Sequence, residues 1–240
     1  MIKRFNSLLA FIVIPVLTYA VLSTAADEIA SKEVARTERN APILRLIESP
    51  SPNHFGFDQH GDLIRIALPQ KLNTDSNLAL IATCPTVTDV TVWFTKRGNP
   101  FLSKSGFDCL RKLPRLEKLE IGCCELIPGE MFASMCELTN LKVLSLNRAE
   151  PSDEDYVALT NLVRLEELSI AGAAHFGDPE FKRLNVLRHL RKITLYSTSV
   201  SYRCLDAVSG FPSLTNFVAT RRRLEMGDKM EKIEWSKLDR

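Results

Sequence analysis

A six-residue pattern that recurs at a nearly constant interval constrains this chain more than any other feature. Seven segments fit L-x-x-L-x-L, with other apolar residues at some positions: LIRIAL (63–68), VTDVTV (87–92), LEKLEI (116–121), LKVLSL (141–146), LEELSI (165–170), LRKITL (190–195) and LTNFVA (214–219). Their central residues are Ile66, Val90, Leu119, Leu144, Leu168, Ile193 and Phe217, separated by 24, 29, 25, 24, 25 and 24 positions. Alternate residues of a strand share one face, so each segment is expected to be a strand with one buried side. Self-similarity at this period indicates a stacked repeat protein.

Apolar pairs upstream of most central residues predict a short helix before each strand. Leu159 and Leu162, for example, are spaced i, i+3, as on one face of a helix. Asp75 can cap one such helix, and Asp178 followed by Pro179 supplies a cap and a proline at the first helical position of another. Each repeat is therefore predicted to be a helix followed by a strand.

The first 26 residues have the pattern of a secretory signal. Lys3 and Arg4 precede an apolar run over 8–22, which ends in small residues, and cleavage is expected after Ala26. The run is shorter than a typical membrane span, but an uncleaved membrane anchor remains an alternative. The segment contains two of the 31 basic residues and no acidic one, so the remainder has 31 − 2 = 29 basic against 29 acidic residues. This balance argues against wholesale binding of nucleic acid.

The repeats resemble the leucine-rich-repeat family, whose unit reads L-x-x-L-x-L-x-x-N/C/T-x-L. With the export signal, they are most similar to small exported bacterial members. The resemblance covers residues 63–219 and implies an α/β solenoid of about seven repeats, with a curved parallel sheet and short helices on its convex side. The position five after the central residue fits the consensus at Thr95, Cys124 and Thr198 and departs from it at Ala149, Ala173 and Arg222. The polar ladder at this turn is therefore expected to be incomplete.

The segments outside the repeats are expected to cover the ends of the stack, because a repeat array exposes apolar surface there. Residues 27–62 are interpreted as an N-terminal cap, made of a helix and a hairpin that turns at Asp58 to Asp62. Residues 220–240 are interpreted as a C-terminal cap or tail, in which MEKIEW (230–235) repeats the strand spacing.

The concave face is the binding face that the resemblance implies, and the repeat register assigns residues to it. Eight side chains there are candidates for ligand binding: Trp93, Phe94, Lys118, Glu120, Arg148, Lys192, Tyr196 and Arg221. Aromatic and arginine side chains supply much of the energy of protein interfaces. Two alternatives remain open: the Trp93–Phe94 pair packs against the longer 29-residue repeat, and Arg221 belongs to a solvated edge.

Six cysteines are present, at positions 84, 109, 123, 124, 136 and 204. Their places in the repeat do not favour disulfides, so free and mostly buried thiols are predicted. Cys124 is expected to point inward and Cys123 outward, because neighbouring strand residues alternate faces. His54, His60 and Asp58 form only a loose loop cluster, and no metal or cofactor is predicted.

No catalytic motif or arrangement emerges from the sequence. The leading hypothesis is a monomeric, non-catalytic protein-interaction scaffold of the cell envelope or extracellular space. It would bind a protein or peptide on its concave face, no nucleic acid, and a membrane only through an uncleaved signal. The alternatives are a thiol-based redox or metal-dependent protein that uses Cys123, and a membrane-tethered structural component of the envelope.

Overall fold

The computed structural model describes residues 42–46, 54–94, 102–122, 127–148, 151–152, 154–221 and 231–236, with the side chains of 221 and 231–236 excepted. The chain divides into two compact units, Met1–Arg45 and Leu46–Arg240. The described part of the first unit contains a helical turn at 42–44. The predicted signal segment, residues 1–26, lies outside the described residues. Within the described ranges, no helix combines the length and apolarity needed to cross a membrane.

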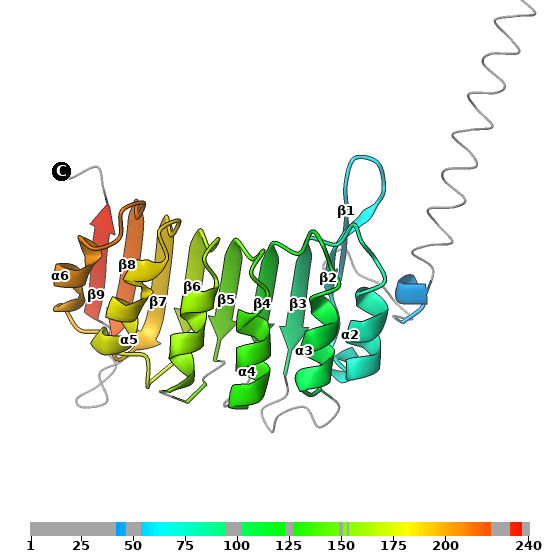
Figure 1. The fold of residues 1–240 in the computed structure, drawn as a ribbon, viewed down its shortest axis with the longest axis horizontal. Coiled ribbons are helices and arrows are strands. Elements are labelled where there is room, and N and C mark those ends of the chain that lie inside the picture. The colour runs from blue at the N-terminus through cyan, green and yellow to red at the C-terminus, as the bar shows by residue number, and fades with distance from the viewer. Residues whose placement is uncertain are drawn as a thin grey trace, which may run out of the picture. The chain divides into compact units, whose positions relative to one another are not determined.

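The second unit is built on one sheet in which the described strands lie in chain order (Figure 1). The strands are β1 (Phe55–Phe57), β2 (Leu63–Ala67), β3 (Asp89–Trp93), β4 (Lys118–Gly122), β5 (Val143–Asn147), β6 (Glu167–Ala171), β7 (Lys192–Thr198), β8 (Asn216–Arg221) and β9 (Glu231–Ser236). Strands β2 to β8 are parallel. Strands β1 and β9 pair antiparallel with the two ends of this array. Each repeat thus adds one parallel strand.

The predicted repeat register is confirmed. Leu144 of β5 pairs with Leu119 of β4 on one side and with Leu168 of β6 on the other. The same pairing of central residues continues from Ile66 to Phe217. All seven central residues are at most 1% exposed, so they form one continuous row through the core.

The described helices of the second unit pack on one face of the sheet (Figure 1). They are α2 (Asp75–Ile81), α3 (Lys104–Leu110), α4 (Gly129–Cys136), α5 (Asp178–Arg183) and α6 (Cys204–Val208), with 3-10 turns η1 (Gln70–Leu72), η2 (Asp155–Asn161) and η3 (Leu184–Val186). The apolar pair Leu159 and Leu162 is fully buried, but the helix predicted there is the 3-10 turn η2, which ends just before Leu162. Edge-to-face aromatic contacts join neighbouring repeats, where Tyr156 meets Phe132 and Phe176. This alternation of strand and helix is the α/β leucine-rich-repeat solenoid.

The structure corrects the predicted helix caps. Thr74, and not Asp75, caps α2, because its hydroxyl accepts a hydrogen bond from the Asn77 backbone N–H at 3.2 Å. Gly177 precedes α5, and Asp178 is the first residue inside that helix. Each aspartate is therefore the first residue of its helix and not the N-cap. Its carboxylate can bond to the next repeat.

The polar ladder after the strands is incomplete, as predicted. Ala173 is fully buried at the consensus position and has no polar side chain. Thr198 is also buried, and its hydroxyl has no hydrogen-bond partner among the described residues. In the first repeat Asn73 bonds instead to three backbone carbonyls, including that of Trp93 at 3.0 Å. That amide fixes the end of β3.

The predicted hairpin turn is present between β1 and β2. The Asp58 N–H donates to the Asp62 carbonyl at 3.0 Å, and Gly61 has a φ of 74°. The Asp58 carboxylate accepts the backbone N–H groups of His60 and Asp62 at 2.8 and 2.9 Å. This carboxylate therefore orders the turn.

Candidate binding surface on the open face

We call the face of the sheet that carries none of the described helices the open face. Its side chains come from the strand positions that alternate with the buried central residues. One row, directly after the central residues, crosses the middle of the sheet as Thr91, Glu120, Ser145, Ser169 and Thr194, paired in register. The centre of the open face is thus covered by short polar side chains, with Glu120 as the charged member of this row.

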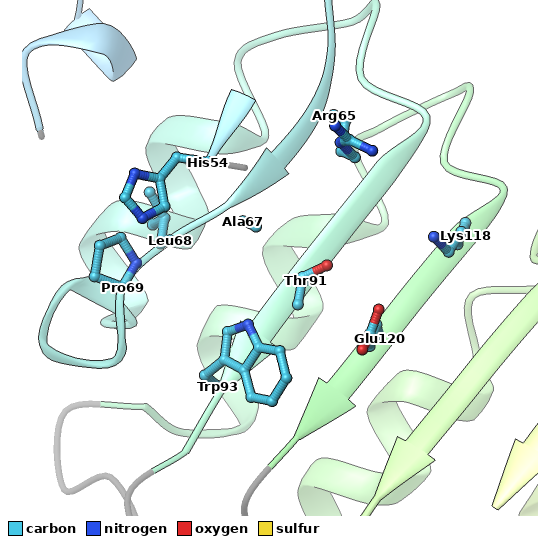
Figure 2. A pocket seen from close by; sticks show the side chains of 9 residues that line it. All are labelled: His54, Arg65, Ala67, Leu68, Pro69, Thr91, Trp93, Lys118 and Glu120. Carbon is cyan, nitrogen blue, oxygen red and sulfur yellow. The ribbon is translucent and has the colours of Figure 1, made fainter. Parts of the chain in front are cut away.

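Two adjoining hollows lie across the middle of the open face. The first, of about 390 Å³, extends over β2, β3 and β4, and Trp93, Lys118 and Glu120 line it together with Arg65, Thr91 and His54 (Figure 2). The second, of about 400 Å³, extends from β4 to β7 and includes Lys192 and Tyr196. Lys118 and Glu120 line both hollows. The two hollows are therefore adjacent parts of one surface.

Trp93 lies on this surface because its neighbour in register is a glycine. Trp93 pairs with Gly122 of β4. A Cβ atom added to Gly122 would be 2.4 Å from Cζ3 and 2.5 Å from Cε3 of the indole. The ring therefore occupies the space of an absent side chain, and it remains partly exposed. The glycine at this register position is the sequence signal that would have located the ring.

The placement of Phe94 on the open face was wrong. Phe94 is 2% exposed and stacks against Phe107 of α3, with ring centroids 6.5 Å apart. The equivalent residues of three later repeats, Arg148, Gly172 and Ser197, have a left-handed backbone with φ of 53°, 71° and 52°. Phe94 has a negative φ, and its ring turns into the core. The alternative of packing within the long repeat is thus correct for Phe94.

Both candidate lysines are held in ion pairs between adjacent strands. Lys118 Nζ is 3.1 Å from an Asp89 carboxylate oxygen, and Lys192 Nζ is 3.4 Å from a Glu167 oxygen. One position earlier, Lys142 pairs with Glu117 at 2.7 Å. Partly exposed pairs of this kind contribute about 0 to 1 kcal/mol each. Their main consequence is that positive charge at this edge of the sheet is locally neutralised.

The remaining candidates lie at the strand ends. Arg148 is exposed after β5, and its N–H donates to the Ala171 carbonyl at 2.6 Å. Its stem crosses Gly172, where an added Cβ would be 3.1 Å from Arg148 Cγ. Tyr196 of β7 is 45% exposed. Arg148 lines neither hollow, and the side chain of Arg221 lies outside the description.

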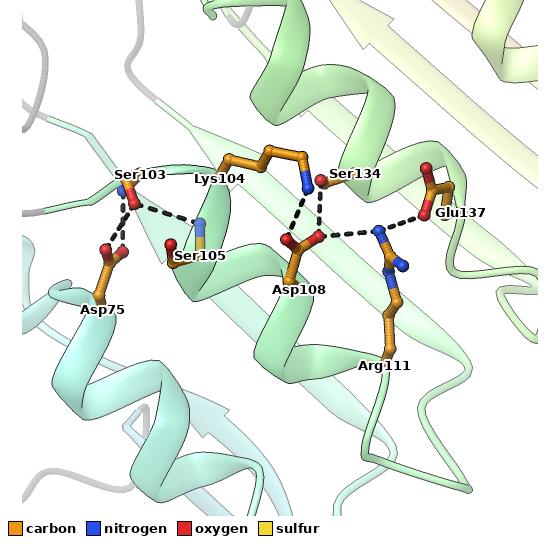
Figure 3. Close-up of polar contacts among 8 residues, drawn as sticks. All are labelled: Asp75, Ser103, Lys104, Ser105, Asp108, Arg111, Ser134 and Glu137. Atoms are coloured by element: carbon orange, nitrogen blue, oxygen red, sulfur yellow. Dashed lines mark hydrogen bonds and ion pairs between the residues drawn. The ribbon is translucent and has the colours of Figure 1, made fainter.

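On the helix face, carboxylates bond to serine residues of neighbouring repeats. Asp75 accepts the Ser103 N–H at 2.8 Å and its hydroxyl at 2.6 Å, and Asp178 does the same for Ser201 at 2.7 and 2.5 Å. Figure 3 shows Asp75 with Ser103, and next to them Asp108, which binds Lys104, Arg111 and Ser134. The hydrogen bonds from Lys104 and then Ser134 lower the pKa of the Asp108 carboxyl. These contacts hold consecutive repeats together.

Cys109, Cys136 and Cys204 are free thiols, as predicted. Cys84, Cys136 and Cys204 are at most 2% exposed. Burial, reinforced by the carboxylates of Asp178 and Asp206, raises the pKa of the Cys204 thiol to about 12, and burial likewise raises that of Cys136. A thiol that remains protonated is a poor nucleophile and a poor metal ligand. Cys123 and Cys124 lie outside the described residues. Within the described ranges, no three histidine, cysteine or acidic side chains converge on a metal position.

Among solved structures, leucine-rich-repeat proteins resemble this chain. An internalin of Listeria monocytogenes is 21% identical, with a TM-score of 0.40, over 55% of this chain and 36% of that one. A leucine-rich-repeat protein of Leptospira interrogans is 19% identical, with a TM-score of 0.39, over 57% of this chain and 32% of that one. The ectodomain of the Arabidopsis receptor kinase HAESA, in complex with a peptide hormone, is 14% identical, with a TM-score of 0.30, over 77% and 45%.

This chain therefore spans less than half the length of these three structures. No family model matches the sequence, and no curated protein matches it. The class of protein, a leucine-rich-repeat solenoid, follows from the chain's own repeats, their register and the strand–helix alternation.

Proposed function

We propose that this chain is a non-catalytic, monomeric protein-interaction scaffold that binds a folded protein or an extended peptide across its open face. The single observation that carries the proposal is the continuity of the two hollows through Lys118 and Glu120. Together they offer one surface from β2 to β7. Such a surface suits a partner that contacts several strands at once.

Two partly exposed aromatic side chains stand at opposite ends of this surface. Trp93 and Tyr196 occupy the same register row, connected through Gly122, Asn147 and Ala171 of the intervening strands. Neighbouring strands are about 4.8 Å apart, so the two residues are separated by about 19 Å across the sheet. An extended segment covers that distance with about six residues at about 3.3 Å each. A small metabolite would reach only one of them.

We further propose that the protein works outside the cytoplasm, after export directed by residues 1–26. The charge and apolar pattern of that segment support this proposal. Sequencing the N-terminus of the purified protein from its own host tests it. A terminus just after Ala26 supports release, whereas a retained Met1 end favours the membrane-tethered alternative.

The binding proposal is tested by affinity capture of envelope and extracellular proteins on the full chain, followed by titration of the captured partner. Interfaces draw most of their affinity from a few aromatic and arginine side chains. Trp93→Ala and Tyr196→Ala should each weaken binding about fivefold or more.

Arg183→Ala is the matched control, because Arg183 lies on the helix α5 and its side chain is 51% exposed. It should leave the affinity unchanged. If Arg183→Ala abolished binding while both aromatic variants bound normally, the helix face would be the functional surface and the proposal would be wrong.

A further inference from the structure

The first hollow contains an aromatic ring beside a carboxylate. Trp93 rests on Gly122, and Glu120 precedes that glycine by two residues on the same face of β4. Both side chains line the hollow, and Figure 2 shows them on adjacent strands with Thr91 beside them. Residues two apart on a strand are separated by about 6.6 Å. One bound group can therefore contact the indole and the carboxylate together.

Two cationic side chains, Lys118 and Arg65, line the same hollow. Lys118 pairs with Asp89 at 3.1 Å. Arg65 bends over Gly56 of β1, where an added Cβ would be 3.1 Å from its Nε. Glu120 has no hydrogen bond and no ion pair within the described part of the chain. Its carboxylate is the acidic group of this hollow, and no cation of the described residues lies within ion-pair distance of it.

We propose that this hollow is a subsite for a basic side chain of the partner, arginine or lysine, held between the Trp93 ring and the Glu120 carboxylate. The inference rests on the proposed open-face binding and specifies the chemistry of the partner. A cation is attracted to the face of an indole ring and forms a charge-assisted hydrogen bond with a carboxylate. Arginine fits best, because its planar guanidinium stacks on the ring and directs two N–H groups at one carboxylate.

A neutral side chain of the same shape would be disfavoured. It would displace water from Glu120 without supplying a positive charge, and desolvating an unpaired carboxylate is costly. Selectivity for charge at constant shape is therefore the signature of the subsite. The partner segment that follows from this geometry is extended and places a basic residue near the β3 end of the open face, about 19 Å from Tyr196.

The test uses two probes, the acetylated and amidated pentapeptides Gly-Gly-Arg-Gly-Gly and Gly-Gly-citrulline-Gly-Gly. Citrulline keeps the shape of arginine and lacks its charge. Binding is followed on the full chain by the indole N–H resonance of Trp93 in NMR spectra. The chain has two tryptophans, so Trp93→Phe assigns the signal. The arginine peptide should shift this resonance saturably and bind about fivefold more tightly than the citrulline peptide.

Glu120→Gln is the decisive variant, because it removes the charge and keeps the shape of the side chain. It should bring the arginine preference down to about one. Glu117→Gln is the matched control, since Glu117 already pairs with Lys142 at 2.7 Å at the edge of the sheet. That variant should keep the preference.

Three results would overturn the proposal: equal binding of both peptides, an arginine preference that survives Glu120→Gln, or no saturable shift with the arginine peptide at millimolar concentration. The proposed scaffold function is tested separately, by measuring how the variants bind the captured partner. If Trp93→Ala and Tyr196→Ala weaken that partner while the peptides show no charge preference, the scaffold stands and the basic subsite is wrong. If the partner is also insensitive to both variants, both proposals fail.

Discussion

Truncation of Leu144 probes the core row of the solenoid, because this residue lies at its centre. Leu144 is fully buried and is flanked in register by Leu119 and Leu168. Leu144→Ala removes the three carbon atoms beyond Cβ, a loss of about 2.4 kcal/mol at about 0.8 kcal/mol per buried carbon. Hydrogen-bonded strands on both sides limit collapse, so a cavity cost of about 1 kcal/mol is added. The expected loss of unfolding free energy is about 3 to 4 kcal/mol.

Urea unfolding followed by circular dichroism measures this loss. With a denaturant slope of about 2 kcal/mol per molar, the midpoint should fall by about 1.5 to 2 M. Glu167→Ala is the control on the neighbouring strand, where the side chain is 48% exposed and pairs with Lys192 at 3.4 Å. Its cost should stay below about 1 kcal/mol. Equal and small midpoint shifts for the two variants would refute the idea that these central residues form one core row.

Three further outcomes are expected. Gly122→Ala should displace the Trp93 indole, lower the unfolding free energy by about 1 to 3 kcal/mol and change the tryptophan fluorescence, whereas unchanged stability and emission would contradict the close packing. Because the pKa of Asp108 is lowered in the folded state, its carboxylate should stabilise the fold above the unfolded pKa of about 3.9, and this stabilisation should be lost as pH falls through the lower folded pKa. In an acid titration of stability, Asp108→Asn should therefore lose less unfolding free energy than the unchanged protein. Identical profiles for the two proteins would argue against these hydrogen bonds. In native protein, a thiol reagent followed by mass mapping should label Cys123 before Cys124 and should reach Cys204 only after unfolding; early labelling of Cys204 would contradict its burial.

The rows of side chains across the sheet could be predicted from the sequence, because the repeat period and the two-residue period of a strand agree there. The repeat spacing aligns Leu119, Leu144 and Leu168, and the two-residue period of a strand assigns their neighbours to the opposite face. The pairing of Asp89 with Lys118 was also within reach. Both residues directly precede a central residue, so they are neighbours in register although 29 positions apart in the chain.

Details at the strand ends could not be predicted in this way. At the position of Phe94 the strand has ended, and the sign of φ decides which face a side chain joins. The helix starts differ from the prediction by one residue for a similar local reason. Thr74 and Asp75 can both cap the helix, and Thr74 does so. The Trp93 ring, in contrast, could have been located from the register, because Trp93 pairs with Gly122 of the next repeat.

Oxidative footprinting of the chain, alone and in complex with its captured partner, tests the open face most directly. Trp93 and Tyr196 report on that face, and Tyr202, which precedes α6 and is 67% exposed, serves as the internal reference. Tryptophan and tyrosine side chains are oxidised in proportion to their exposure, and mass spectrometry locates each site. If the open face binds the partner, Trp93 and Tyr196 should be protected and Tyr202 should stay reactive. Protection of Tyr202 with undiminished oxidation of Trp93 and Tyr196 would contradict binding at the open face.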